Sequence, residues 1–442
     1  MTRFWCECAW LGGADVAPRV LIEVDGDRVA SIEVGVEPPA GAQRLRGVVI
    51  PGLANAHSHA FQRALRGRTH GARGSFWSWR DQMYALVDAL DPDLMLALAR
   101  ATFAEMALAG VTVVGEFHYV HHGPGGVPYE DPNAMGAAVL QAAADAGIRV
   151  TLLDACYLFG GPGVAATGAQ VRFRDEDADA WAQRVAGLVE RPGVRIGSAI
   201  HSMRAVDPEA AGVVAVWAAD RSAPLHAHVS EQPGENDQCL EAYGDSPTTV
   251  LADAGALSAR FTAVHATHVT ERDRALLGAA RACCCLCPTT ERDLADGIGP
   301  ARGLRDSGAR LAVGSDSQAV IDLFEEVRAV ELDERLATGV RAQHAADELL
   351  DAATAGGYAS LGWDDGGVLR AGALADFVAV RTDGVRLAGA PEEQLVDAVV
   401  FSAAAADVGD VVVGGRVVVR DGCHVSIDVP RELAAAIKEV GL

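Results

Sequence analysis

Eight short runs rich in β-branched residues alternate along this chain with longer segments rich in alanine and leucine. The runs lie at residues 46–55, 111–118, 149–156, 194–201, 223–230, 261–266, 281–287 and 309–316. Such alternation is typical of a parallel sheet whose strands are joined by crossover helices. Because eight such units match the strand number of a (β/α)8 barrel, we predict an α/β fold built on a TIM-like barrel.

The two ends of the chain have a different pattern. Residues 20–34 predict one hairpin, and residues 411–419 predict another with a Gly-Gly turn. We expect both ends to form one small β-sandwich domain, over residues 1–48 plus 370–442. The barrel, which we expect to be metal-dependent, would then cover residues 49–369.

Three segments connect these parts. We expect a helix at residues 333–358 and a loop at 362–373 to lead from the barrel back to the small domain. The segment at 121–133 is rich in glycine and proline, so it predicts a loop that is a candidate lid.

Polar side chains gather where the predicted strands end. In order, these ends carry His57 and His59, Glu116 and His118, Asp154, His201, His228, His265, Cys287 with Thr289, and Asp316. A barrel enzyme places its catalytic groups at the carboxyl ends of its strands, whereas scattered surface histidines would not collect there. The pattern therefore predicts one active site that is rich in histidine.

His57 and His59 follow an apolar run and are separated by one residue. On an extended strand, residues i and i+2 point the same way, so both imidazoles can bind one metal ion. His226 and His228 form a similar pair on a later run and are rivals for the same role. We favour His228, because it lies nearer the end of its strand and three residues before Glu231.

Composition argues against several classes of protein. The formal net charge of -23 disfavours nucleic-acid partners, which need a basic face. No apolar run reaches the ~20 residues of a membrane span, and no signal-peptide pattern is present, so we expect a cytoplasmic protein with no membrane partner. The only lysine is Lys438, which disfavours Schiff-base chemistry, P-loops and metal centres bridged by a carboxylated lysine.

The nine cysteines are odd in number, and four of them lie at Cys283, Cys284, Cys285 and Cys287. Adjacent residues on a strand do not easily bridge one another, so we expect reduced thiols. A thiol cluster can bind zinc, but paired Cys-x-x-Cys knuckles are missing here. Buried small apolar side chains are the favoured role.

Several motifs resemble those of one enzyme superfamily. They are His57-Ser-His59-Ala-Phe-Gln62, Glu116-Phe-His-Tyr119, His201-Ser-Met-Arg204, His226-Ala-His228-Val-Ser-Glu231, His265-Ala-Thr-His268, Cys287-Pro-Thr-Thr-Glu291 and Gly314-Ser-Asp316-Ser. They resemble the amidohydrolase superfamily throughout the chain and, within it, the deiminases that act on N-formimino-L-glutamate in histidine degradation. The pattern departs at Gln318, where a histidine is expected, and at Arg292-Asp293, which bears on fine substrate contacts.

The resemblance implies one divalent metal ion per subunit, usually zinc, bound by His57, His59, His228 and Asp316. Three neutral nitrogens and one carboxylate leave a net positive centre that can lower the pKa of a bound water toward ~7. Iron and manganese stay open as alternatives.

Three residues are candidates for catalysis. We expect Glu231 to move protons between the attacking water and the leaving nitrogen, because a carboxylate beside such a water can do so. Asp316 can bind the metal and also accept a hydrogen bond from its water. We expect His265 to hydrogen-bond the attacking oxygen or the tetrahedral centre, and His268 to be structural.

Other groups would determine substrate specificity. The resemblance implies substrate contacts for Gln62, Tyr119, His201 and Arg204, and a guanidinium such as that of Arg204 can hold a carboxylate by two parallel hydrogen bonds. Arg80 resembles an arginine that the family contributes from a neighbouring subunit, so a homodimer is expected. These arginines would offset the negative charge of the chain for an anionic substrate.

The implied reaction is hydrolytic deimination of the small anionic substrate N-formimino-L-glutamate to N-formyl-L-glutamate and ammonia. A related deaminase of a neutral ring, such as a purine, pterin or triazine, stays open because it would use the same metal machinery. A barrel that has lost catalysis is a third reading, and the intact metal and catalytic residues argue against it.

Overall fold

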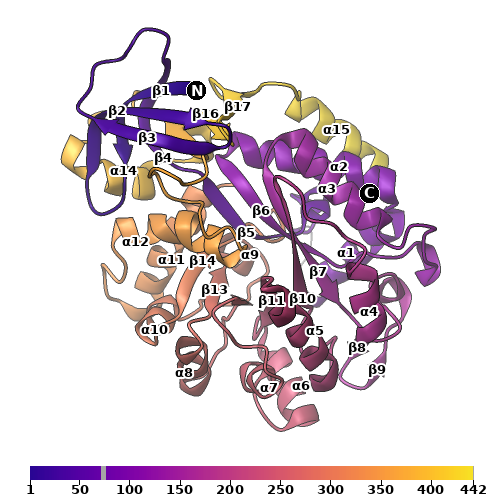
Figure 1. The fold of residues 1–442 in the computed structure, drawn as a ribbon. Helices are drawn as coiled ribbons and strands as arrows, with labels where there is room; N and C mark the ends of the chain where they lie inside the picture. The colour runs from indigo at the N-terminus through magenta and orange to yellow at the C-terminus, as the bar shows by residue number, and fades with distance from the viewer. Residues whose placement is uncertain (71–75, 442) are drawn as a thin grey trace.

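The computed structural model describes residues 1–70 and 76–441, and Figure 1 shows their arrangement. Eight strands form one parallel sheet in chain order. They are β5 (Leu53–Ser58), β6 (Val111–His118), β7 (Arg149–Cys156), β10 (Val194–Ile200), β11 (Leu225–Val229), β12 (Phe261–His265), β13 (Cys283–Leu286) and β14 (Arg310–Val313). Asp316, just after β14, exchanges backbone hydrogen bonds of 3.0 Å with His57 and His59, which closes the sheet. The predicted barrel is confirmed.

Helices surround this barrel (Figure 1). They are α1 (Phe76–Ala89), α2 (Pro92–Leu108), α3 (Ala134–Ala146), α4 (Ala178–Val185), α5 (Pro208–Arg221), α6 (Pro233–Tyr243), α7 (Pro247–Asp253), α8 (Glu271–Ala279), α9 (Pro288–Asp293), α10 (Ala301–Asp306), α11 (Leu323–Thr338) and α12 (Ala346–Asp351). Asp91 and Asp207 cap α2 and α5 by accepting backbone N–H bonds, and a proline follows each cap. None of the described helices is long and apolar enough to cross a membrane.

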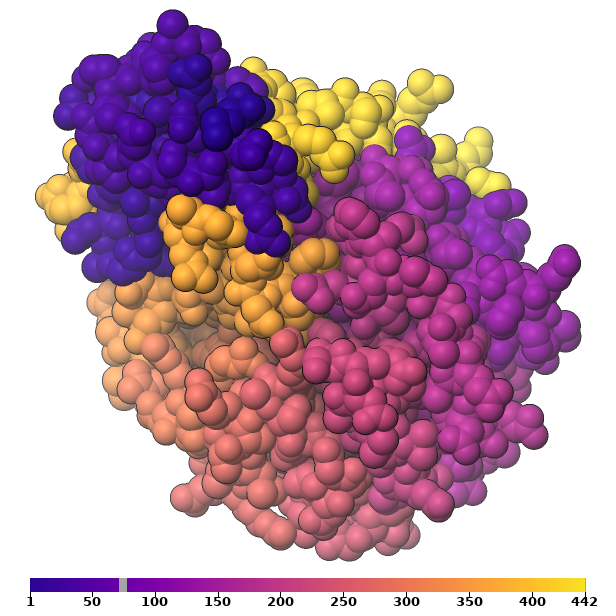
Figure 2. Space-filling view, viewed as in Figure 1, coloured from indigo at the N-terminus to yellow at the C-terminus, as the bar shows by residue number. Residues whose placement is uncertain are grey.

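A second sheet is built from both ends of the chain. Its strands are β1 (Thr2–Trp10), β2 (Val16–Asp25), β3 (Arg28–Val34), β4 (Gln43–Pro51), β15 (Phe377–Val380), β16 (Val408–Val413), β17 (Arg416–Arg420) and β18 (Cys423–His424). They are ordered β18-β17-β16-β15-β4-β1-β2-β3, so β15 pairs with β4 across the two ends. Figure 2 shows the indigo N-terminal segment against a later segment in orange. Phe4 and Phe377 meet in the core of this sheet, with ring centroids 5.1 Å apart. The expected β domain from both chain ends is confirmed.

The first predicted strand, at residues 46–55, is two strands of different sheets. β4 pairs with β1 and β15 of the small domain, whereas β5 pairs with β6 of the barrel. Gly52 lies between them, and a Cβ there would lie 2.1 Å from Thr112 Oγ1, so only glycine fits this crossing. The single predicted strand was therefore wrong, because a continuous apolar run does not show where a chain changes sheets.

The predicted helix at 333–358 is also interrupted. α11 ends at Thr338, and Gly339 adopts the left-handed conformation with φ 72° that terminates a helix. The chain resumes as α12 and continues through a π-helix (Ala352–Gly356) into α13 (Gly357–Ser360).

Two helices after residue 370 pack on the barrel. α14 (Leu395–Ser402) lies against α11 and α12, and Arg328 Nε donates to the carbonyl of Val400 at 3.1 Å. α15 (Val429–Val440) lies along α2, where Arg100 pairs with Glu432 at 2.9 Å. Division of the chain at residues 48 and 370 stays a prediction.

A buried ion pair ties the barrel to the small sheet. Arg149, the first residue of β7, donates to both carboxylate oxygens of Asp376, at 2.7 and 3.1 Å. The hydroxyl of Tyr358 and the backbone N–H of Gly414 donate to the same carboxylate, at 2.8 and 2.7 Å. Because Asp376 is buried, loss of its charge leaves Arg149 without its counter-charge.

We expect Asp376→Asn to lower the free energy of unfolding by about 3 to 5 kcal/mol, the usual cost of breaking a buried pair. Urea denaturation measures the change. The matched control Asp364→Asn removes the exposed partner of Arg260 and should cost less than about 1 kcal/mol. Equal losses in the two variants would contradict a special role for the Asp376 pair.

Candidate active site

A cavity of about 640 Å³ opens at the carboxyl ends of the barrel strands. The predicted site residues that line it are His59, Gln62, Arg80, Tyr119, His201, Arg204, His228, Glu231, His265 and Asp316. His57 lies directly behind the wall and is fully buried, with its ring centroid 4.8 Å from that of His59. The structure thus brings all the predicted residues together, while their roles stay predictions.

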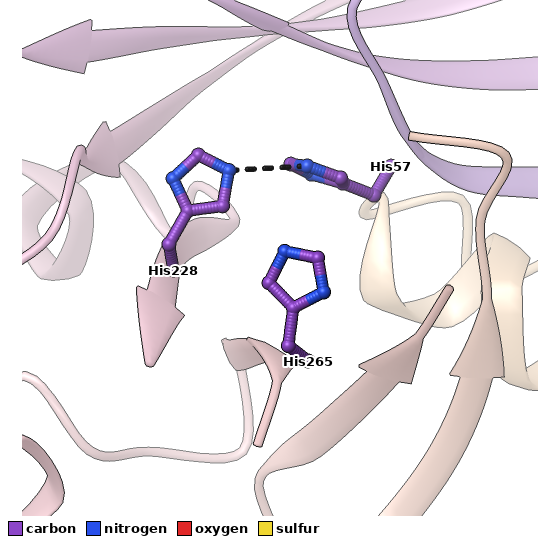
Figure 3. Close-up of side chains that lie close together, drawn as sticks. All are labelled: His57, His228 and His265. Carbon is purple, nitrogen blue, oxygen red and sulfur yellow. Dashed lines mark hydrogen bonds between the residues drawn. The ribbon is translucent and has the colours of Figure 1, made fainter. Parts of the chain in front are cut away.

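Four of these side chains converge on one point. Nε2 of His57 lies 3.2 Å from Nε2 of His228 and 3.2 Å from Oδ1 of Asp316, and Nε2 of His59 lies 3.3 Å from the same oxygen. Figure 3 shows the rings of His57, His228 and His265 directed toward a common centre. The ligand atoms of His57, His59 and Asp316 lie close enough together to hold one ion.

Hydrogen bonds behind the rings orient two of the histidines. Nδ1 of His59 donates to the carbonyl of Phe117, and Nδ1 of His228 donates to the carbonyl of His201, each at 2.9 Å. Each ring therefore presents an unprotonated Nε2 to the centre. Burial lowers the pKa of His57 to about 3 and also lowers the pKa values of His59 and His228, so the imidazoles are neutral.

The centre fits a divalent cation. Burial opposes ionisation of Asp316, but the hydrogen bond from His57 and the charge of His265 hold its pKa below the ordinary range. A single proton on His57 cannot satisfy His59, His228 and Asp316 at once, because all three present lone pairs at this point. Three neutral imidazoles and one carboxylate are a donor set that a divalent metal accepts.

A polar network lies behind the predicted metal donors. The Ser58 hydroxyl and the Ala60 N–H donate to the two oxygens of Glu116, at 2.6 and 2.7 Å. The Gln318 amide donates to Ser58 Oγ at 2.9 Å, and its oxygen accepts from Ser315 Oγ at 2.8 Å. Gln318, where the resemblance expects a histidine, therefore links the first and last barrel strands beside the site and lies outside the cavity lining.

His265 lies among three carboxylates. Its Nε2 lies 3.8 Å from Glu231 and 3.9 Å from Asp316, and its Nδ1 lies 3.3 Å from Glu291. Although burial opposes the charge, these carboxylates raise the pKa of His265 well above its ordinary value. A protonated His265 can donate a hydrogen bond toward the centre. Glu291 was not assigned a role from the sequence, and its position in the motif that starts at Cys287 was the available signal.

The predicted substrate contacts lie beside this centre. Arg204 Nη2 donates to Glu231 at 3.2 Å, so a predicted substrate contact touches a predicted catalytic residue. The Gln62 amide donates to Tyr119 Oη at 2.9 Å, and Tyr119 in turn donates to Met83 Sδ at 3.6 Å. Gln62 Oε1 has no hydrogen-bond partner among the described residues, so it can accept an N–H from a ligand.

Arg80, on α1, lines the cavity of its own chain. Its guanidinium carbon lies 5.4 Å from the centroid of the Tyr84 ring. One chain therefore places both Arg80 and Arg204 in a single cavity. The homodimer in which Arg80 serves a neighbouring site stays a prediction.

Some strand-end residues serve the scaffold. His118 and Asp154 do not line the cavity. Arg184 donates to both oxygens of Asp154 at 2.9 Å and also to Asp175. The ligand atoms of His118, His121 and Asp154 lie close together, but Arg184 already neutralises this carboxylate. A metal there would have to displace a well-formed ion pair.

The cysteine run and the candidate lid also lie outside the cavity wall. All nine cysteines are free, and Cys283, Cys285 and Cys287 pack inside the barrel with small apolar residues. No described residue of the loop at 121–133 lines the cavity. The wall is instead completed by a hairpin of β8 (Phe159–Gly161) and β9 (Val164–Ala165), which the sequence did not predict.

Comparison with known proteins is consistent with this geometry. A sequence model of the amidohydrolase family matches residues 48–418. This chain belongs to the amidohydrolase family. It is 38% identical to formimidoylglutamate deiminase of Pseudomonas aeruginosa, over 92% of each chain, and 30% identical to 5-methylthioadenosine/S-adenosylhomocysteine deaminase of Natronomonas pharaonis, over 93% and 92%. The crystal structure of an amidohydrolase from Brucella melitensis superposes with a TM-score of 0.92 at 34% identity, over the whole of both chains.

The cavity of this amidohydrolase also contains residues that the sequence did not single out. Tyr84, Tyr157 and Phe173 line it beside the two arginines. They come from α1, from the end of β7 and from the segment after it, which the barrel pattern does not distinguish from connecting loops. Only Tyr157 directly follows a predicted strand, and an aromatic residue at that position is weak evidence for a site.

His226, the rival of His228, lies outside the clusters of side chains that could hold a metal among the described residues. Its Nε2 donates to the carbonyl of Ser360 at 3.0 Å, in a deeper layer of the barrel. Burial lowers the pKa of His226 from 6.5 to about 4. Between these pH values the unfolded chain binds a proton that the folded chain does not, so this residue makes the fold less stable as pH falls through that window.

We expect His226→Gln, which keeps a donor for Ser360, to reduce the slope of unfolding free energy against pH by about 1.4 kcal/mol per pH unit. Urea denaturation at several pH values between 4 and 6.5 measures the slope. Zinc content should be unchanged in this variant and strongly reduced in the matched variant His228→Gln. Loss of zinc from both variants would make His226 a candidate metal ligand again.

Proposed function

We propose that this amidohydrolase hydrolyses N-formimino-L-glutamate to N-formyl-L-glutamate and ammonia, as a step of histidine degradation, with one zinc ion per subunit. The observation that carries the proposal is the pair of arginines, Arg80 and Arg204, in the wall of the same cavity as the metal donors. The chain as a whole carries a net charge of -23, so an anionic substrate needs such local cations. The 38% identical relative is named for this reaction.

The metal, when bound by His57, His59, His228 and Asp316, supplies an activated water. Glu231 then acts as the proton carrier, taking a proton from the water as its oxygen bonds to the formimino carbon. The carbon becomes tetrahedral, with the new oxygen and both nitrogens attached. Glu231 gives this first proton to the terminal imino nitrogen, which becomes an NH₂ group. It then takes the remaining proton of the new hydroxyl and passes it to the same nitrogen, so that this C–N bond breaks, ammonia leaves and the C=O bond of the formyl group forms.

Neighbouring side chains hold the reacting groups in place. A protonated His265 donates to the oxygen on which charge develops. Gln62 Oε1, which has no other partner among the described residues, accepts an N–H of the amidine. Arg204 and Arg80 hold carboxylates of the glutamate portion. Binding energy at the carboxylates thus positions the amidine carbon beside the metal donors.

The first experiment measures ammonia release from N-formimino-L-glutamate by the zinc-loaded protein. N-formyl-L-glutamate and 5-methylthioadenosine serve as comparison substrates, the second because a 30% identical relative is named for it. Release restricted to the formimino compound supports the proposal. Release from 5-methylthioadenosine alone would overturn it and assign the cavity to a neutral-ring deaminase.

Glu231→Gln should retain zinc and lower kcat by a factor of about 10² to 10⁴, because the amide cannot carry a proton. Metal analysis and steady-state ammonia release measure the two quantities. The matched control Glu241→Gln changes an exposed carboxylate at the cavity mouth and should keep kcat within about twofold. Full turnover in Glu231→Gln would remove Glu231 from proton transfer.

Arg204→Gln should raise KM about tenfold or more and change kcat less, because a charge-assisted hydrogen bond to the substrate is lost. Steady-state kinetics separate the two constants. Arg272→Gln, at an exposed arginine on α8, is the control and should leave both unchanged. An unaltered KM in Arg204→Gln would show that this guanidinium does not hold the substrate.

A further inference from the structure

Two tyrosines in the cavity wall are joined by one glutamine. The side-chain nitrogen of Gln170 lies 3.2 Å from the hydroxyl of Tyr84 and 3.0 Å from the hydroxyl of Tyr157. Tyr84 comes from α1, Tyr157 follows β7, and Gln170 lies in a short 3₁₀ helix (Gly168–Arg172). Both tyrosines line the cavity that contains Arg80 and Arg204.

The backbone determines which way the Gln170 amide points. The N–H of Thr167 lies 3.2 Å from Gln170 Oε1. A backbone N–H can only donate, so the amide oxygen must face Thr167 and the NH₂ group must face the tyrosines. The NH₂ group has two protons, which is one for each hydroxyl. Tyr84 and Tyr157 are therefore both acceptors toward Gln170.

Each hydroxyl keeps its own proton for another partner. Among the described residues, neither Tyr84 nor Tyr157 donates a hydrogen bond to a protein acceptor. Burial raises the pKa of Tyr157, so this hydroxyl stays protonated. The ring of Tyr157 packs 4.7 Å from the ring of His201, which holds its position. This part of the wall can thus direct the protons of two phenols into the cavity, beside the guanidinium groups of Arg80 and Arg204.

We propose that Tyr84 and Tyr157, oriented by Gln170, form a carboxylate-binding cradle that distinguishes a carboxylate from an amide of the same shape. The identity of the ligand rests on the proposed function, in which the substrate carries two carboxylates. A carboxylate has only acceptor oxygens and can take both phenol protons. A primary amide has an NH₂ group, whose protons would face donors. Tyr84 and Tyr157 bind the substrate directly, and Gln170 is a positioning residue.

The test measures binding to the zinc-loaded protein by isothermal titration calorimetry. The probes are N-formyl-L-glutamate, which the proposed reaction does not consume, and its two monoamides. Wild type should bind one monoamide about tenfold or more weakly than the dicarboxylate, because the amide group of that monoamide replaces the carboxylate that the cradle binds. Tyr84→Phe and Tyr157→Phe should each lower the affinity for the dicarboxylate about tenfold and lower the affinity for the disfavoured monoamide less. The control Tyr243→Phe makes the same change outside the cavity lining and should bind all probes as wild type does.

Gln170→Glu tests the polarity of the cradle. A carboxylate at this position accepts the phenol protons, so both hydroxyls then present lone pairs to the cavity. We expect the preference for carboxylate over amide to disappear or reverse, and KM for N-formimino-L-glutamate to rise with a smaller change in kcat. Should this variant fail to fold, the two phenylalanine variants carry the test, since they keep the rings.

Glutarate separates this inference from the proposed function. Suppose that wild type releases no ammonia from N-formimino-L-glutamate and yet binds glutarate, with an affinity that Tyr84→Phe and Tyr157→Phe each lower. In that case the proposed reaction is wrong and the proposed cradle stands. If both phenylalanine variants bind every probe as wild type does, the cradle is overturned even where ammonia is released. Failure of wild type to bind either dicarboxylate also overturns it.

Discussion

The structure depends on the closure of one sheet. The backbone of Asp316 exchanges hydrogen bonds of 3.0 Å with His57 and His59, so the contact that joins the last strand to the first also joins three of the proposed metal donors. The Ser58, Gln318 and Ser315 side chains repeat this link one layer away. Any change that opened the barrel here would separate the donors. The ligand geometry is therefore a consequence of the fold, and no flexible loop has to supply it.

Electrostatics divides the cavity into two sides. On the metal side, burial keeps His57, His59 and His228 neutral, while Glu231, Glu291 and Asp316 gather around His265. On the other side, guanidinium and phenol groups face the cavity. Arg204 touches Glu231 at 3.2 Å, so the two sides meet at one ion pair. Under the proposed function, this separation allows an anionic substrate to bind beside a centre rich in carboxylates in a chain with a net charge of -23.

Much of this arrangement could be predicted from the sequence, because strand ends of a barrel converge whatever the loops do. His57 and His265 are far apart in sequence, and their position at the ends of buried runs was enough to bring them together. The sheet change at Gly52 could not be predicted, since β4 and β5 form one apolar run. The ion pair of Asp154 could not be predicted either, because its partner Arg184 lies on the connecting helix α4, and the strand pattern does not show which strand such a helix residue contacts. Tyr84 and Gln170 meet only through tertiary packing between two connecting segments.

The predicted residues include the proposed metal and catalytic groups as well as the proposed substrate contacts Arg80 and Arg204, whereas Tyr84, Tyr157 and Gln170 escaped prediction. Relatives 38% and 30% identical to this chain are named for an amidine and for purine-containing substrates, so membership of the family does not by itself select either. A metal centre that activates water serves both kinds of substrate equally. Discrimination must then come from the wall opposite the metal donors, where Arg80, Arg204 and the two tyrosines offer donors to an acceptor-only group. Under the proposed function, a neutral ring would lack the charge-assisted hydrogen bonds that a carboxylate makes with this wall, so it should bind more weakly.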